Sequence, residues 1–198
     1  MSEHENQEHL SGEGTFKASF PKSFIVIIAL ILAGMLGFYY KADYINNPEL
    51  IIEKYFSTQS TSDFTTEAQY LSVFVMAMQL PQYATLSGHE LIQQRPLIEA
   101  DYIKFSEDNS FPPADNMDIK ISPFRQYTLT GKNSALVVFN ALFENQDANM
   151  AASLIREPDG FKIINIIQVD LNDEVIQQSI KNFSIDETDE EYGAYMAE

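Results

Sequence analysis

The sequence has no cysteine and only three histidines among its 198 residues. The lack of cysteine excludes disulfide scaffolds, thiol catalysis and thiolate metal sites, and it suits an oxidising compartment. His4 and His9 lie in a polar N-terminal stretch, so His89 is the one histidine in the part of the sequence that has the composition to fold. A single histidine without further ligands or a placed acid makes neither a metal site nor a catalytic triad. We therefore interpret His89 as an exposed residue near a helix start.

Glycine and basic residues are also scarce. The eight glycines are not spaced as a P-loop or a dinucleotide fingerprint, and no G-x-S-x-G elbow is present. We therefore expect no cofactor and no enzyme activity. Twelve Lys and Arg stand against 29 Asp and Glu, which gives a formal net charge of −17. Such a surface repels phosphate backbones, so we expect no nucleic-acid binding and a basic protein partner instead.

One long apolar run contrasts with this composition. Residues 23–40, SFIVIIALILAGMLGFYY, would span roughly 27 Å as a helix, close to the hydrocarbon core of about 30 Å. Aromatic rings and lysines flank the run, as at membrane interfaces. Polar residues 1–22 precede it and no A-x-A cleavage site follows it, which argues against a signal peptide. The run predicts an uncleaved, single-pass transmembrane anchor.

The length and polarity of the segments on either side of the anchor suggest its orientation. Residues 1–22 have too few apolar side chains to fold and are predicted to be a disordered cytoplasmic tail. The domain-sized part after the anchor is then extracytoplasmic, which places the protein in the cell inner membrane with a periplasmic domain. Ala29, Ala33 and Gly37 recur every fourth residue, a spacing that lets two helices approach and form a homodimer. Small residues are equally common in spanning helices that stay monomeric, so both interpretations stay open.

Residues 46–183 are predicted to form one α+β domain. Asn47-Pro48-Glu49 starts a helix that runs to Phe56, and a second helix covers residues 68–78. The capping box Ser87–Glu90 starts a third helix, which Pro96 interrupts before residues 97–108 continue as helix. From residue 119 apolar and polar residues alternate, a period of two that predicts about four antiparallel strands. A bulge is expected at Pro123. The strands are expected around residues 119–129, 134–143, 150–156 and 161–169.

The C-terminal part is expected to hold one further helix and a tail. Asn172 is predicted to cap a helix over residues 173–183 that packs back on the sheet. Residues 184–198 carry six acids and no base, so we predict a solvated, disordered acidic tail, with a partner-binding segment as the alternative.

The end of the predicted meander carries a family resemblance. The stretch Asp159-Gly160-Phe161-Lys162-Ile163 resembles the final hairpin of the nuclear transport factor 2-like superfamily, and the likeness covers roughly residues 48–169. That resemblance implies a cone, in which helices curl over one face of a strongly curved sheet. The layout is also similar to the VirB-type bitopic assembly factor of type IV secretion systems, which implies a structural role. That family often has an Asn-Pro-x-Gly turn where this chain has residues 157–160, EPDG.

A cone implies a pocket between its helices and its sheet. Six residues are candidates for lining a pocket that binds a small apolar ligand: Phe74, Met78, Tyr102, Tyr127, Phe139 and Phe143. The alternative is that these side chains, with Met76, only form the core. Some relatives use an acid and a tyrosine for proton transfer, and Asp101 with Tyr102 or Tyr127 would be the counterparts here.

Taken together, the anchor, the acidic surface and the missing catalytic motifs favour a noncatalytic scaffold or adaptor. We expect it to act in an envelope protein complex, with other membrane or envelope proteins as partners and secretion as one setting. The alternative is a membrane-tethered binder of a small apolar ligand, and an isomerase-type enzyme ranks third.

Overall fold

The computed structural model describes residue 26 and residues 28–36, 47–59, 61–109, 119–143 and 146–197. The chain forms two compact units, Met1–Tyr40 and Lys41–Glu198. In the first unit, residues 28–36 are helical and exposed. None of the helices that the structure describes has the length and apolar character needed to cross a membrane. Only part of the predicted anchor is described, and the predicted tail 1–22 and Gly37 lie outside the described residues.

The second unit begins with a series of helices. They are α2 (Pro48–Gln59), α3 (Phe64–Tyr70), α4 (Val73–Met78), the short 3-10 helix η1 (Pro81–Tyr83), α5 (Gly88–Gln93) and α6 (Arg95–Asn109). Two predicted helix starts are confirmed. The Asn47 side chain accepts hydrogen bonds from the backbone N–H groups of Glu49 and Leu50, and Ser87 and Glu90 form a complete capping box.

The single helix predicted over residues 68–78 is wrong, because α3 and α4 are separated at Leu71 and Ser72. The Ser72 N–H donates to the Ile163 carbonyl at 2.8 Å, and Leu71 forms a parallel bridge with Ile163. The Ser72 side chain then caps α4. This contact with the sheet takes the place of a helical hydrogen bond. The interruption predicted at Pro96 is confirmed, and it lies just before the proline, because α5 ends at Gln93 and α6 begins at Arg95. Pro96 is the second residue of α6, where a missing N–H costs little.

The strands form one antiparallel sheet, which confirms the α+β class. They are β1 (Ile119–Pro123), β2 (Leu129–Thr130), β3 (Ser134–Phe143), β4 (Gln146–Glu157) and β5 (Gly160–Gln168), with the short helix η2 (Arg125–Tyr127) between β1 and β2. The order is β1-β3-β4-β5, and β2 also pairs with β3. The register shift lies at Ser153–Leu154 opposite β5, not at Pro123, which pairs with Phe139 in unbroken register. Gly160 has φ 130°, which the tight β4–β5 turn requires.

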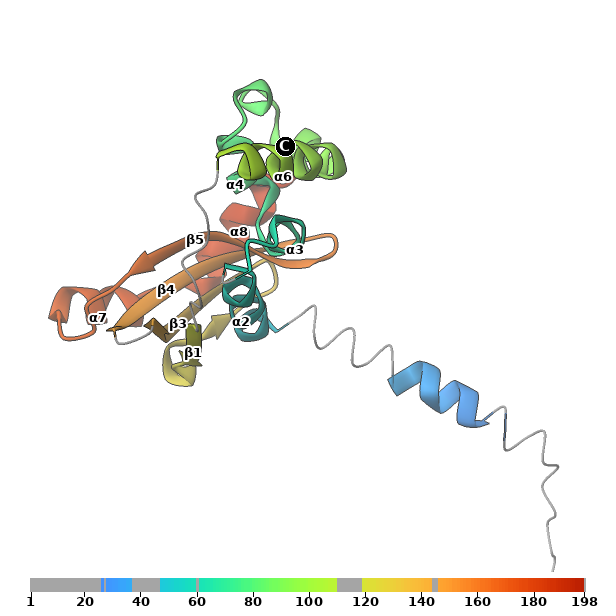
Figure 1. Ribbon diagram of the computed structural model, residues 1–198. Coiled ribbons are helices and arrows are strands. Elements are labelled where there is room, and N and C mark those ends of the chain that lie inside the picture. Colours follow the sequence, from blue (N-terminus) through green and yellow to red (C-terminus); the bar gives the residue numbers. More distant parts are fainter. Residues whose placement is uncertain are drawn as a thin grey trace, which may run out of the picture. The chain divides into compact units, whose positions relative to one another are not determined.

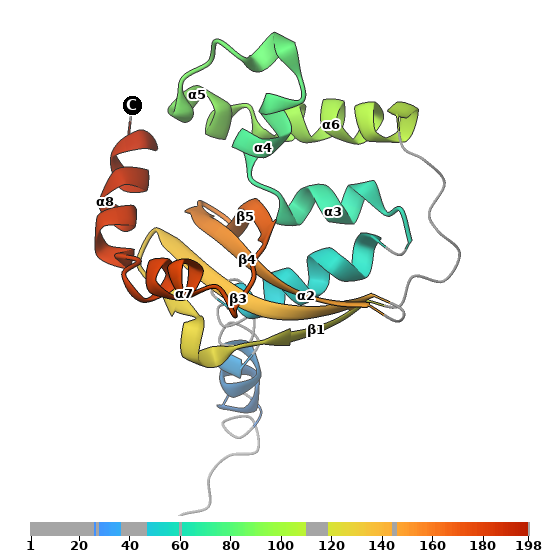
Figure 2. The same ribbon diagram turned by 90° about the vertical axis from the view of Figure 1, so that its left-hand side faces the viewer.

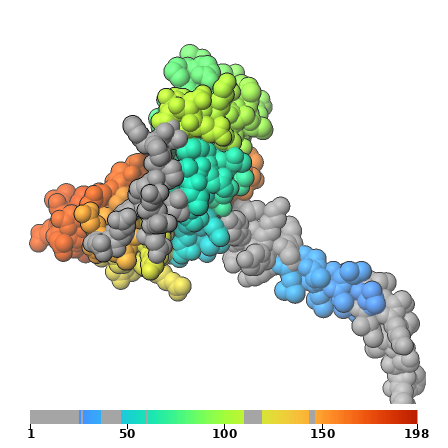
Figure 3. Space-filling view, viewed as in Figure 1, coloured from blue at the N-terminus to red at the C-terminus, as the bar shows by residue number. Residues whose placement is uncertain are grey.

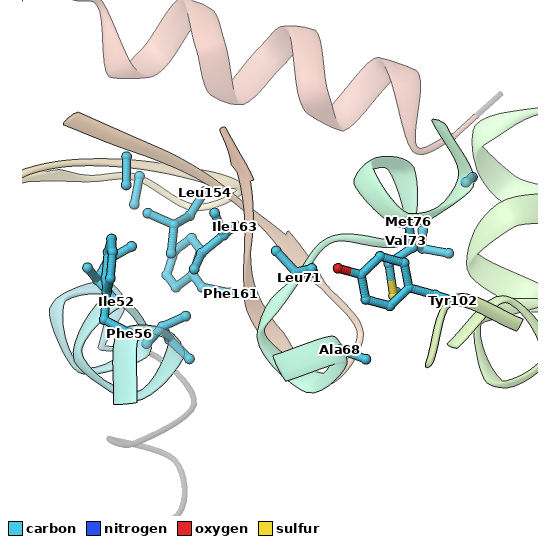
Figure 4. Close-up of a cluster of buried hydrophobic side chains, with 14 of the residues drawn as sticks. Ile52, Phe56, Ala68, Leu71, Val73, Met76, Tyr102, Leu154, Phe161 and Ile163 are labelled. Atoms are coloured by element: carbon cyan, nitrogen blue, oxygen red, sulfur yellow. The ribbon is translucent and has the colours of Figure 1, made fainter. Parts of the chain in front are cut away.

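Alternate residues of β3 belong to two different apolar clusters, as expected for a strand that is buried on both faces. Val137 and Phe139 face the helices in the main core, together with Phe161 and residues of α2 to α6. Figure 4 shows this core, with Ile52 and Phe56 of α2 close to the strand residues and Tyr102 of α6 beside Val73 and Met76. Val138 belongs to the second cluster, on the opposite face, which α7 (Glu174–Lys181) covers.

Helix α2 lies directly on the sheet, and the helices α4 to α6 form a lobe farther away (Figure 1). Figure 2 shows the same stack from the side, with α3 between this lobe and the strands. We call α4, η1, α5 and α6 the helical lobe. The space-filling view separates the green lobe from the orange strands, with α2 and α3 in cyan between them (Figure 3).

The C-terminal segment differs from the sequence prediction. The cap of α7 is Asp173 and not Asn172, because the Asp173 carboxylate accepts from the N–H groups of Val175 and Ile176. The disordered tail predicted from residue 184 is wrong, since the structure contains α8 (Ile185–Tyr195), which Ser184 caps. Helix α8 runs alongside the domain from the sheet toward α5 (Figure 2). Its acidic composition favours disorder, but specific contacts described below hold it in place.

Candidate functional site

An apolar groove on the helical lobe is the leading candidate site. We call it the α4–α5 groove, and its volume is about 360 Å³. Its lining comes from α4, η1, the segment that follows η1, α5 and α8, and consists of Phe74, Ala77, Met78, Tyr83, Ala84, Leu86, Leu91 and Tyr195. No charged residue belongs to this lining, although the chain is strongly acidic.

The spacing of the buried residues along α4 explains which of its side chains line the groove. Val73, Met76 and Ala77 point into the core and are buried, so Phe74 and Met78 lie on the outer side of this short helix. Met78 is 78% exposed, the highest value among the exposed large apolar side chains that the structure describes. An exposed methionine beside aromatic rings makes a soft, adaptable surface of the kind that protein-binding grooves use.

Helix α8 supplies one wall of the groove. The rings of Tyr195 and Phe74 lie 5.1 Å apart between centroids at an interplanar angle of 55°. The Tyr195 carbonyl packs against Gly88, where an added Cβ would lie 2.5 Å from the oxygen. Any other residue at position 88 would push the end of α8 away, so glycine is required for this contact.

A polar rim borders the groove at Tyr83. Its hydroxyl donates to Asp101 Oδ2 at 2.6 Å, and Gln82 Nε2 donates to the same oxygen at 3.3 Å. The hydrogen bond to Asp101 is the main reason that the pKa of Tyr83 lies above its usual value. The structure thus engages Asp101 with Tyr83 and Gln82, and not with Tyr102 or Tyr127 as the proton-transfer hypothesis required.

A second group of titratable residues is buried between α2, α3 and α6. The Tyr102 hydroxyl donates to Glu67 Oε1 at 3.1 Å. Burial raises the pKa of the Glu67 carboxyl. Burial and the nearby Glu67 charge together raise the pKa of Tyr102 to about 12, and the same two causes raise the pKa of Tyr55. Glu67 and Tyr102 do not line the α4–α5 groove. The pair is thus a buried hydrogen bond within the core.

A smaller groove lies near the β4–β5 turn, with a volume of about 300 Å³. Its charged lining residues are Glu99, Asp159 and Lys162. Lys162 Nζ donates to the Gln69 carbonyl at 2.6 Å and to Asp159 Oδ2 at 2.7 Å, and Glu99 accepts from Arg95 Nε at 2.7 Å. These charges are paired within the protein. The described part of the chain contains no group of three or more residues that would hold a metal ion.

The helical lobe is joined to the sheet by a buried ion pair, Arg95 with Glu157. Glu157 Oε1 also accepts from the Ser72 hydroxyl at 2.8 Å and from the Val73 N–H at 2.9 Å. Arg95 Nη2 donates to the carbonyls of Ala68 and Leu71 at 3.2 and 3.1 Å. This network connects β4, the α3–α4 junction and α6, and it fixes the position of the groove relative to the strands.

The structure places the six predicted pocket residues at different sites. Phe74 and Met78 line the α4–α5 groove. Tyr102 and Phe139 are buried in the main core, as Met76 is, and Tyr127 packs against the second cluster on the opposite face of the sheet. Phe143 is the last residue of β3, and its side chain is outside the description.

The sequence predicted only two of the eight residues that line the groove, Phe74 and Met78. Tyr83, Leu86 and Leu91 flank the capping box, and the short apolar spacing around this signal could have identified them. Tyr195 lies in a segment predicted to be disordered, and its role depends on contacts far apart in the sequence.

No family model, no curated protein and no solved structure matches the chain. The site is therefore interpreted from its own geometry.

Proposed function

We propose that the protein is a single-pass, membrane-anchored, noncatalytic adaptor of an envelope protein complex, and that the α4–α5 groove is its protein-binding surface. The observation that carries this proposal is a highly exposed methionine in the apolar lining of the groove, next to residues that are buried in the core. Met78 is 78% exposed, whereas Met76 and Phe139 are each 0% exposed. A large apolar side chain that the domain leaves exposed beside an apolar groove is typical of a site that binds another protein.

The membrane part of the proposal is supported by the sequence. The run 23–40 with its flanking lysines and aromatic rings fits a signal anchor, with the N-terminus in the cytoplasm and the domain in the periplasm. The resemblance of residues 159–163 to the nuclear transport factor 2-like hairpin supports the finer fold, a curved cone. The similarity in layout to the VirB-type assembly factor supports a structural role in the envelope.

Site-specific photocrosslinking in native membranes tests the adaptor proposal. A photoreactive amino acid replaces Met78 in the groove, and the matched control replaces Val175 on α7, which is 71% exposed and equally apolar. We expect position 78, but not position 175, to form an adduct with one envelope protein, identified by mass spectrometry. No adduct at position 78, or the same adducts at both positions, contradicts the proposal.

A small apolar ligand is the second candidate occupant. The groove volume of about 360 Å³ is within the range of roughly 300–1,000 Å³ that small-molecule sites have. Native mass spectrometry of the purified protein would then show a copurified apolar molecule. Met78→Asp places a charge in the groove and would remove that molecule, whereas Val175→Asp would retain it.

A further inference from the structure

Helix α8 is docked mainly through one carboxylate. Asp189 accepts hydrogen bonds from three consecutive backbone N–H groups of the β2–β3 turn: from Lys132, from Asn133 at 2.9 Å and from Ser134 at 2.6 Å. The Ser134 hydroxyl donates to the same carboxylate at 2.6 Å. A carboxylate that receives four donors is held in a defined position, as anions are in backbone nests.

Missing side chains allow this close approach. A Cβ on Gly131 would lie 2.5 Å from Asp189 Oδ2, and a Cβ on Gly193 would lie 3.0 Å from Asn133 Nδ2. Asn133 Nδ2 donates to the Asp189 carbonyl at 3.0 Å. At the far end of α8, Tyr195 rests on Phe74 and Gly88, as described above. Asp189, Gly193 and Tyr195 thus each make one of these contacts, and together they form the sequence pattern Asp-x3-Gly-x-Tyr.

The remaining properties of α8 favour detachment. None of its residues is buried. Its five acidic residues, Asp186, Glu187, Asp189, Glu190 and Glu191, place like charges three and four residues apart, which destabilises an isolated helix. Phe183 just before it packs in the second cluster, so an undocked α8 would stay tethered close to its site. A short tether gives an effective concentration in the millimolar range, which is enough to keep a weak docking contact formed.

We propose that α8 is a removable occupant of a recognition surface, and that a protein partner takes its place. We call this surface the α8-receiving surface; it consists of the turn 131–134, Gly88 and Phe74. The partner is a helix that presents a carboxylate to the turn, a glycine to Asn133 and an aromatic ring to Phe74. Because Tyr195 is one wall of the α4–α5 groove, its displacement frees Phe74 for the incoming ring. This inference rests on the proposed function of the groove and adds the kind of partner and its regulation.

A labelled peptide tests the inference on the full-length protein in mild detergent. The peptide is residues 184–198 of the chain, SIDETDEEYGAYMAE, with an N-terminal fluorophore, and binding is followed by fluorescence anisotropy. Asp189→Ala alters only α8 and leaves the receiving surface intact. We expect at least about tenfold tighter peptide binding to this variant than to the wild type, whose own α8 competes at its effective concentration. A peptide with Tyr195→Ala should lose at least about tenfold in affinity, because it lacks the ring that packs against Phe74.

Gly193→Val is the second variant, since its side chain meets Asn133 and should undock α8 by a different route. Hydrogen exchange should show faster exchange of α8 amides in both variants, and circular dichroism checks that the domain is folded. Equal peptide binding to wild type and variants, no binding at all, or unchanged protection of α8 overturns the inference. The assay requires no envelope partner. Peptide binding without a Met78 adduct therefore contradicts the adaptor proposal alone, and an adduct without peptide binding contradicts this inference alone.

Discussion

Replacing Glu157 by alanine is the sharpest test of how the helical lobe is held on the sheet. The Glu157 side chain is fully buried in its salt bridge with Arg95, whose own side chain is 11% exposed. Its carboxylate also satisfies the Ser72 hydroxyl and the Val73 N–H. Glu157→Ala leaves both of these donors unpaired and removes the buried counter-charge of the guanidinium.

The size of the effect follows from these contacts. Removing one partner of a buried ion pair costs about 3–5 kcal/mol, which includes the donors that are left unsatisfied. Arg95 keeps Glu99, whose side chain is 27% exposed, and the carbonyls of Ala68 and Leu71. We therefore expect the lower end of the range, about 3 kcal/mol. In a domain of this size that lowers Tm by roughly 6–12 °C.

Denaturation followed by circular dichroism measures the change, because the sequence has no tryptophan for fluorescence. Far-ultraviolet and tyrosine signals should give the same midpoint if unfolding is two-state. Glu157→Gln keeps an oxygen that accepts from Ser72 and Val73, so it should lose less than Glu157→Ala. Ser72→Ala removes one hydrogen bond and should cost about 1 kcal/mol. A loss below about 1 kcal/mol for Glu157→Ala would refute the view that this network anchors the lobe.

Three further predictions concern other parts of the chain. Burial raises the pKa of Glu67 in the folded state, so the wild type loses stability as the pH rises above the ordinary carboxyl pKa of about 4; Glu67→Gln lacks this loss and should gain stability relative to wild type with rising pH, measured by urea denaturation. Burial raises the pKa of Asp189, but its hydrogen bonds outweigh this and lower it, so docking of α8 should persist at neutral pH and weaken only as the pH falls below about 4, seen as faster α8 hydrogen exchange. Replacing Ala33 and Gly37 by leucine and isoleucine should reduce self-association in a membrane reporter assay, and an unchanged signal would exclude the predicted dimer.

Local signals in the sequence predicted much of the fold. The Asn47 cap, the Ser87–Glu90 box and the change to a period of two at Ile119 each depend on neighbouring residues, and all three agree with the structure. The break at Ser72 depends on a hydrogen bond to Ile163, which is 91 positions away, so periodicity alone could not show it. The same limit explains why only Phe74 and Met78 of the predicted pocket lie in the groove.

The C-terminal helix shows why composition was misleading there. Charge counts predict disorder because they assume that only apolar burial offsets the entropy of ordering. Asp189 instead obtains four hydrogen bonds from a turn that is more than 50 positions away. A single well-placed carboxylate, with glycines where the chains approach, orders a segment that would otherwise be solvated.

Two independent contacts set the geometry of the α4–α5 groove. The Arg95–Glu157 network joins the helical lobe to β4, and α8 joins the same lobe to the β2–β3 turn. The network is a buried ion pair with its hydrogen bonds, whereas none of the residues of α8 is itself buried. Release of α8 therefore leaves the lobe attached and Phe74 in place. A partner helix can replace α8 without unfolding the domain, and Glu157→Ala should weaken peptide binding to the Asp189→Ala chain because it loosens the lobe that carries Phe74.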